Sequence, residues 1–127
     1  MAYVGGAGVC GLAARAVAVI RIDTAWLAVE PLDMRAGPDT ALARVVRVFG
    51  EARPHHAYLF ANRRSTRLKV LVNDGFGVWL CARRLHQGKF SWPTRGTSVS
   101  LTPEQLQALV LGLPWHRLGE VASIRVA

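Results

Sequence analysis

The sequence is poor in the residues that build metal centres and disulfide frameworks. It has two cysteines, Cys10 and Cys81, and four histidines. Neither cysteine belongs to a C-x-x-C motif, and a structural zinc site needs four ligands at characteristic spacings that these residues do not supply. We therefore expect no metal ion and no cofactor. So few cysteines are typical of a reduced, cytoplasmic protein.

Long apolar runs are also absent. The chain has no run of about eighteen uninterrupted apolar residues, the length that a membrane-spanning helix requires. Residues 1–23 are small and apolar, but no charged residue precedes Arg15, whereas a signal peptide carries its positive charge before the apolar run. We expect neither secretion nor membrane association. We interpret residues 1–23 as an N-terminal extension that is flexible or adds an edge strand.

Acidic residues are nearly absent from one third of the chain. The protein has 16 Lys and Arg, 8 Asp and Glu, and a net charge of +8. Residues 53–95 contain nine of the basic residues and a single acid, Asp74, while the remainder contains seven residues of each sign. The entire excess of positive charge therefore lies in this segment. It favours a polyanionic partner such as nucleic acid.

The basic segment also has the clearest strand pattern. Apolar or alternating runs occupy residues 58–62, 67–72 and 78–83, and Asp74 with Gly75 marks a turn between the last two. We predict a three-stranded antiparallel meander whose second and third strands form a hairpin around this turn.

An odd-numbered hairpin loop would set the register of the two strands. Lys69 would oppose Cys81 and Arg67 would oppose Arg83 on a basic, partly aromatic face, with a wholly aliphatic face behind it. Facing arginines need an anion or solvent to offset their repulsion. The face is therefore either a phosphate-binding surface or an ordinary solvated one.

Helical patterns flank the meander in the chain. Pro38 begins a predicted helix that ends at Gly50. Thr102, Pro103 and Gln105 form a capping box that begins a second helix. The predicted apolar positions are Leu42, Val45, Val46 and Phe49 in the first helix, and Leu106, Leu109, Val110 and Leu113 in the second.

The order of these elements predicts an α+β fold. We expect a single compact domain at residues 24–116, with a mainly antiparallel sheet and two helices packed on one face. Within it, residues 24–29 read as a strand and residues 94–100 as a polar loop. Residues 117–127 are expected to form a C-terminal tail.

Three segments resemble a known family in order and spacing. They are WLAVEPLDMRAGPD at residues 26–39, YLFANRRSTRLKVLVNDGFGVWLCARRLHQGKFSWP at residues 58–93, and SLTPEQLQALVLGLPW at residues 100–115. They closely resemble the Orf2-like, or TnpB, accessory proteins of the IS66 family of bacterial insertion sequences. The chain departs from the family pattern at Ala36, Pro38 and Asn73.

This resemblance implies an accessory role in DNA transposition. Elements of this family encode a separate DDE-type transposase and a sister accessory protein beside the Orf2-like protein. The implied partners are therefore DNA, the transposase and the sister protein, and no small-molecule substrate is expected.

The first functional hypothesis is a DNA-binding accessory factor. Nothing in the chain resembles a recognition helix rich in base-reading side chains, so contacts to phosphates should exceed contacts to bases. The candidate nucleic-acid-binding residues are Arg63, Arg64, Arg67, Lys69, Arg83, Arg84 and Lys89.

Two alternatives remain open from the sequence. One is a protein-docking module that recruits or stabilises the transposase through exposed aromatic side chains such as Trp79 and Trp115. The other is a metal-dependent nuclease, which needs convergent carboxylates. Its candidate ligands are Asp33, Asp39, Asp74 and Glu104. A turn explains Asp74 and a helix N-terminus explains Glu104, so we expect no catalytic residues and no enzymatic activity.

Overall fold

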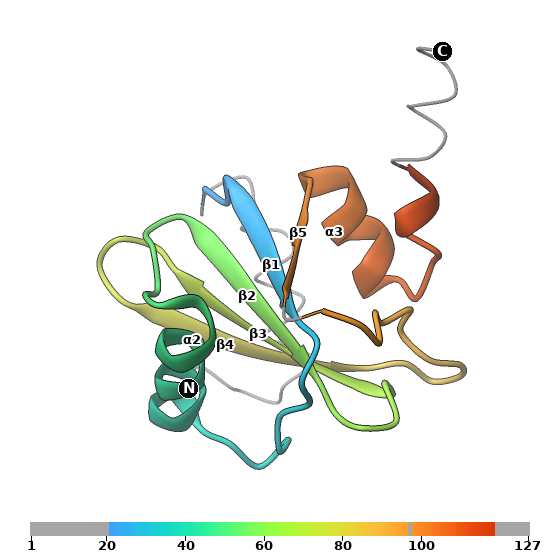
Figure 1. Ribbon diagram of the computed structural model, residues 1–127, viewed down its shortest axis with the longest axis horizontal. Helices are drawn as coiled ribbons and strands as arrows, with labels where there is room; N and C mark the ends of the chain where they lie inside the picture. The colour runs from blue at the N-terminus through green and yellow to red at the C-terminus, as the bar shows by residue number, and fades with distance from the viewer. Residues whose placement is uncertain (1–20, 97, 119–127) are drawn as a thin grey trace.

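Five strands form one open sheet in the order β4-β3-β2-β1-β5 (Figure 1). The computed structural model describes residues 21–96 and 98–118. The elements are β1 (Thr24–Ala28), α2 (Pro38–Phe49), β2 (His56–Ala61), β3 (Arg67–Asn73), β4 (Val78–Arg84), β5 (Ser98–Leu101) and α3 (Pro103–Val110). Nearly all of the expected extension and tail lie outside the described residues, so the proposed domain boundaries stay predictions.

The α+β class and the mainly antiparallel sheet are confirmed. The strand pairs β2–β3, β3–β4 and β1–β5 are antiparallel, so the predicted three-stranded meander is present. Strand β1 runs parallel to β2, because the chain crosses over through α2 between them. The predicted polar loop at residues 94–100 is partly wrong, since β5 begins at Ser98 and pairs with β1.

The two helices lie on opposite faces of the sheet, so the prediction that both pack on one face is wrong. In β2, Tyr58 and Phe60 pack in a cluster with Val45 of α2. Their neighbour Leu59 belongs to a second cluster with Leu109 of α3. Alternate side chains of a strand point to opposite faces. A continuous apolar run like that of β2 is typical of a strand buried on both faces, and it does not reveal which helix covers which face.

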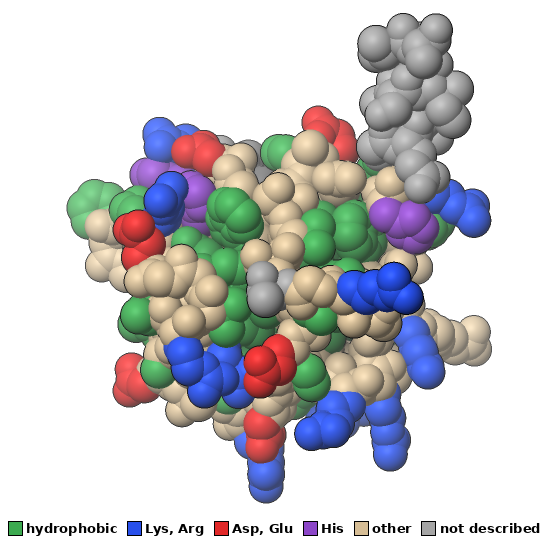
Figure 2. All heavy atoms as spheres, viewed as in Figure 1, with side chains coloured by type: hydrophobic (Ala, Val, Ile, Leu, Met, Phe, Trp, Pro, Cys, Tyr) green, Lys and Arg blue, Asp and Glu red, His purple; other side chains and the backbone are tan. Residues whose placement is uncertain are grey.

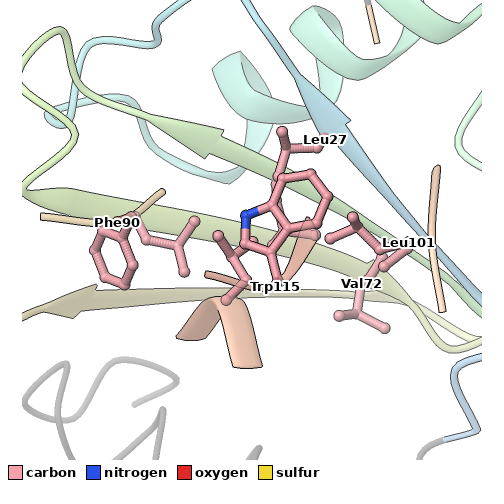
Figure 3. Close-up of a cluster of buried hydrophobic side chains, with 10 residues drawn as sticks. Leu27, Val72, Phe90, Leu101 and Trp115 are labelled. Carbon is pink, nitrogen blue, oxygen red and sulfur yellow. The ribbon is translucent and has the colours of Figure 1, made fainter. Parts of the chain in front are cut away.

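Two tryptophans that anchor loops belong to or pack against the cluster around Leu109, which we call the α3-side cluster. Trp115 lies beside Leu27 and Leu101 in the cluster that Figure 3 shows, and only 7% of its surface is exposed. Its Nε1 donates to the Ser91 carbonyl at 2.7 Å. Trp92 donates its Nε1 to the Ala28 carbonyl at 2.8 Å. The prediction that Trp115 is an exposed docking residue is therefore wrong.

The helix ends follow the sequence closely. In α2, Pro38 lies at the first turn, and the Gly50 N–H donates to the Val46 carbonyl at 2.9 Å with a positive φ. In α3, the capping box is formed, because the Gln105 N–H donates to Thr102 Oγ1 at 3.2 Å and its side chain accepts from the Thr102 N–H at 3.0 Å.

The predicted apolar faces of the helices are right only in part. Val45 and Leu109 are buried, but 48% of Val46 and 50% of Leu113 are exposed. Ala41 takes a buried position of α2 instead. Val46 lies one residue beyond the buried Val45, and Leu113 follows the end of α3, so both turn away from the core.

The β3–β4 hairpin has a four-residue loop, which shifts its register by one residue from the predicted one. Asn73 pairs with Val78, and the Asp74 N–H donates to the Gly77 carbonyl at 3.0 Å. The Asp74 carboxylate accepts hydrogen bonds at 2.8 Å from the Phe76 and Gly77 N–H groups. These bonds favour the longer loop, because they satisfy backbone donors inside it.

The shifted register exchanges the predicted faces of β4 relative to β3. Arg67 pairs with Arg84 rather than Arg83, and Lys69 pairs with Ala82 rather than Cys81. A slip of one residue moves every side chain of a strand to the other face. No face of the hairpin is wholly aliphatic, since Arg83 lies across from Leu68.

Candidate nucleic-acid interface

Exposed basic side chains gather at one end of the sheet. Because β2, β3 and β4 are successive antiparallel strands, the end of β2, the start of β3 and the end of β4 lie at the same end. Lys and Arg side chains line the lower right edge in Figure 2, over the loops beyond these strand ends in Figure 1. We call five exposed residues there the basic end, namely Arg63, Arg64, Arg67, Arg84 and Lys89.

Asn62 builds the turn that carries Arg63 and Arg64. Its Oδ1 accepts from the N–H groups of Thr66 at 2.9 Å and Arg67 at 3.1 Å. Its Nδ2 donates to Thr66 Oγ1 at 3.0 Å. The amide group therefore replaces backbone partners across the turn, and the two arginines project from a fixed loop.

A backbone hydrogen bond joins this turn to the loop that carries Lys89. The Phe90 N–H donates to the Ser65 carbonyl at 2.7 Å, and Ser65 has a left-handed φ of 57°. Phe90 is 2% exposed and packs in the α3-side cluster. Lys89 is thus held beside the turn after β2 rather than at a separate site.

Arg67 and Arg84 are cross-strand partners at the open end of the hairpin. Both are exposed. Like charges that face each other across two strands cost about 0.2–1 kcal/mol relative to neutral pairs. An anion between the two guanidinium groups would offset this cost.

Lys69 does not lie on the exposed surface that the sequence predicted for it. Its residue is 8% exposed, and its Nζ donates to the Ala36 carbonyl at 2.6 Å. Burial lowers the pKa of this ammonium group, and the charge of Asp33 opposes the shift. Lys69 fastens the segment before α2 to the sheet.

Arg83 also has a structural contact. It lies on the α3 side of the hairpin, and its Nε donates to the Val110 carbonyl at 2.6 Å, at the last residue of α3. A cation favours the C-terminal end of a helix, because unpaired carbonyls and the helix dipole make that end negative. Arg83 is exposed, but this bond already explains its position.

A groove of about 700 Å³ lies beside the basic end. It runs along the start of β3 and the end of β4 and reaches the segment before α2. We call it the Lys69 groove. Its lining includes Met34, Arg67, Lys69, Arg83, Arg84 and His86.

The basic end makes no ion pair with the acids of the described chain. Among residues 21–96 and 98–118, every ion pair joins an acid to an arginine outside the basic end. These pairs are Arg21–Asp23, Arg35–Asp33, Arg47–Glu30 and Arg53–Glu51. Five positive charges are therefore concentrated without carboxylates in direct contact.

Two of the four carboxylates suggested for a metal site, Asp33 and Asp74, have local partners. Asp33 accepts from Arg35 Nη2 at 2.8 Å and Nε at 3.1 Å, which lowers the pKa of Asp33 to about 2. Hydrogen bonds from the Phe76 N–H and then from Trp79 lower the pKa of Asp74. Asp39 and Glu104 lie in the first turns of α2 and α3. The described residues contain no group of three or more His, Cys, Asp or Glu that could hold a metal ion.

Phe76 is an exposed aromatic residue that the sequence interpretation did not single out. It lies in the hairpin loop, and its side chain is fully exposed. Trp79 is 37% exposed and donates its Nε1 to Asp74 Oδ2 at 2.8 Å. An apolar residue between two loop glycines, Gly75 and Gly77, was the signal available in the sequence.

No helix in the described part of the chain is long and apolar enough to cross a membrane.

Comparisons with known proteins agree with the resemblance in the sequence. The family model described as IS66 Orf2 like protein matches residues 23–120. An uncharacterised protein of Sinorhizobium fredii (strain NBRC 101917 / NGR234), y4hO, is 34% identical over 94 residues, which cover 72% of this chain and 81% of the relative. A second uncharacterised protein of that strain, y4jC, is 30% identical over 94 residues, 72% of this chain and 80% of the relative. No solved structure matches. The chain therefore belongs to the family of IS66 Orf2-like proteins, which places it among the accessory proteins of insertion-sequence transposition.

Proposed function

We propose that this protein binds DNA without catalysing a reaction, and that the basic end contacts the phosphate backbone. One observation carries the proposal: five exposed basic side chains lie at one end of the sheet and make no ion pair with the described acids. The partner of such a surface is a polyanion. The family acts in the transposition of insertion sequences, and the polyanion that takes part in transposition is DNA.

The basic end suits the phosphate backbone better than the base edges. Its residues come from turns and strand ends rather than from a helix that fits the major groove. Contacts to phosphates position a protein on DNA but carry no sequence information directly. We therefore expect little sequence preference.

The test is to measure the affinity of the parent protein for two unrelated duplexes at several salt concentrations. Each neutralised phosphate contributes about −0.9 to the slope of log affinity against log salt, so the five residues of the basic end give a slope as steep as about −4.5 if each neutralises its own phosphate. The two duplexes should give similar affinities and slopes. A strong preference for one duplex with a shallow slope would contradict backbone binding.

A second candidate function is docking onto the transposase or the sister accessory protein. The observation in its favour is the exposed Phe76 at the end of the hairpin opposite the basic end. The partly exposed Trp79 is hydrogen-bonded to Asp74 of the same loop. Aromatic residues are enriched at interface hot spots. A pull-down of the transposase with and without nuclease treatment separates the functions, because only a docked complex survives removal of DNA.

A further inference from the structure

The Lys69 groove contains a buried positive charge with few partners. The Lys69 ammonium group has three donors, and among the described residues its one hydrogen bond goes to the Ala36 carbonyl. The Asp33 carboxylate is held by Arg35 and forms no ion pair with Lys69. A buried charge without a directly bonded counter-ion is costly, and the nearby charge of Asp33 offsets only part of that cost. A group that supplies negative charge from the groove would relieve the rest.

Two further cations lie at the mouth of the same groove. Lys69 and Arg67 are two residues apart in β3, and therefore share a face of the sheet. Arg84 pairs with Arg67 across the hairpin and lies on that face too. All three line the groove. Arg83 lines it as well, but its Nε is already bound to the Val110 carbonyl at the end of α3.

We infer that the Lys69 groove seats one phosphate group of the bound DNA, with Lys69 Nζ as the inner donor and the Arg67 and Arg84 guanidinium groups at the mouth. This inference rests on the proposed function and deepens it. Guanidinium groups bind phosphate through paired N–H donors, and an ammonium group adds a compact charge. The alternative is that Lys69 only fastens the segment around Ala36, in which case it does not affect the salt dependence of binding.

Lys69→Met tests the inference, because methionine keeps a long apolar stem and removes the charge. We expect the slope of log affinity against log salt on duplex DNA to become less negative by about 0.9, the value for one lost phosphate contact. The matched control is Arg53→Gln, which removes the same charge at the other end of the sheet, where Arg53 pairs with Glu51. Its slope should equal that of the parent protein.

Equal slopes for Lys69→Met and the parent protein would overturn the inference. The proposed function would still stand if the parent binds DNA and the double variant Arg67→Gln with Arg84→Gln has a less negative slope. Absence of DNA binding by the parent protein at low salt would overturn both. Duplexes with and without 5′-phosphates identify the source of the phosphate. If Lys69→Met changes the salt slope on both duplexes, the groove holds an internal phosphodiester. If it changes the slope only on the phosphorylated duplex, the groove holds a phosphate at a strand end.

A measurement on the parent protein avoids any folding defect of the variant. Inorganic phosphate is titrated at constant ionic strength, with chloride as the control, while backbone amide signals are recorded by NMR. We expect phosphate-dependent shifts at residues 67–69 and 82–84, and none around Arg21 and Arg53. Amide shifts of similar size at all basic residues would contradict a defined phosphate-binding site in the groove. If the groove binds inorganic phosphate but Lys69→Met binds DNA with the parent slope, the phosphate in the groove does not come from DNA, which would contradict the inference.

Discussion

Arg67 and Arg84 face each other across β3 and β4, although both carry a positive charge. No acid of the described chain forms an ion pair with either residue. The pair therefore lowers the stability of the hairpin end slightly and creates a place where an anion is favoured. This relationship links the fold to the proposed contact with DNA.

Replacing one member of the pair by an acid should stabilise the fold. We expect Arg84→Glu to raise the free energy of unfolding by about 0.2–1 kcal/mol, because a like-charge pair becomes an opposite-charge pair. The same variant should bind DNA more weakly. Urea unfolding at low salt measures the first effect.

Arg64→Glu is the matched control for this prediction. Arg64 lies in the turn after β2 and has no cross-strand partner in the ladders. It should lose DNA affinity without the gain in stability. Equal stabilities for the two variants would show that the Arg67–Arg84 repulsion is fully screened.

Leu109→Ala should lower the free energy of unfolding by about 2–5 kcal/mol, the usual range for truncating a buried leucine. Leu109 is fully buried in the α3-side cluster. Leu111→Ala is the control, because 59% of this leucine is exposed and a surface change typically stays within about 0.5 kcal/mol. A parent-like stability for Leu109→Ala would mean that α3 contributes little to the core.

Acid should destabilise the protein through Asp33 and Asp74. The pKa of Asp33 falls from 3.8 to about 2 through its bonds with Arg35, and the bonds from Phe76 and Trp79 lower the pKa of Asp74. A carboxyl group with a lowered folded-state pKa stabilises the fold above its unfolded-state pKa. That contribution is lost as the pH falls through the folded-state value.

The expected loss of stability therefore lies between about pH 4 and pH 2, the window between the unfolded and folded pKa values. Urea unfolding at a series of pH values measures it. The double variant Asp33→Asn with Asp74→Asn should be less stable at neutral pH and show a smaller drop in acid. A drop of unchanged size would assign acid sensitivity to other groups.

Phe76→Ser should leave the stability of the protein within about 0.5 kcal/mol of the parent, because the side chain is fully exposed. If the hairpin loop docks onto a protein of the element, this variant should lose the nuclease-resistant complex with the transposase while its DNA affinity is unchanged. A complex of parent strength would remove Phe76 from the docking hypothesis.

Local features of the fold were predictable from the sequence because they depend on neighbouring residues. Gly50 at the end of α2 and the capping box of Thr102 and Gln105 are set within a few residues of chain. The three strands of the meander follow from short apolar or alternating runs. The gathering of Arg63, Arg64, Arg67, Arg84 and Lys89 follows from those strands, since antiparallel pairing brings their ends together.

Features that depend on one residue of register or on distant packing were not predictable. The side chain of Asp74 favours a four-residue loop, and this change alone separates Arg83 from Arg67. Lys69 is buried because the segment around Ala36 covers it from 33 residues away in the sequence. Trp115 is buried for a similar reason, since the sheet and the loop at Ser91 enclose it.

The most direct test of the central claim compares two double variants that lose the same charge. Arg67→Gln with Arg84→Gln removes two cations of the basic end, while Arg21→Gln with Arg53→Gln removes two ion-paired cations at the other end of the sheet. Duplex DNA affinity is measured for both variants and the parent across several salt concentrations. The account predicts that the slope of the first variant is less negative than that of the parent by at least about 0.9, the value for the one phosphate contact that the two arginines share, while the second keeps the parent slope. Equal slopes for the two variants would contradict the assignment of DNA binding to the basic end.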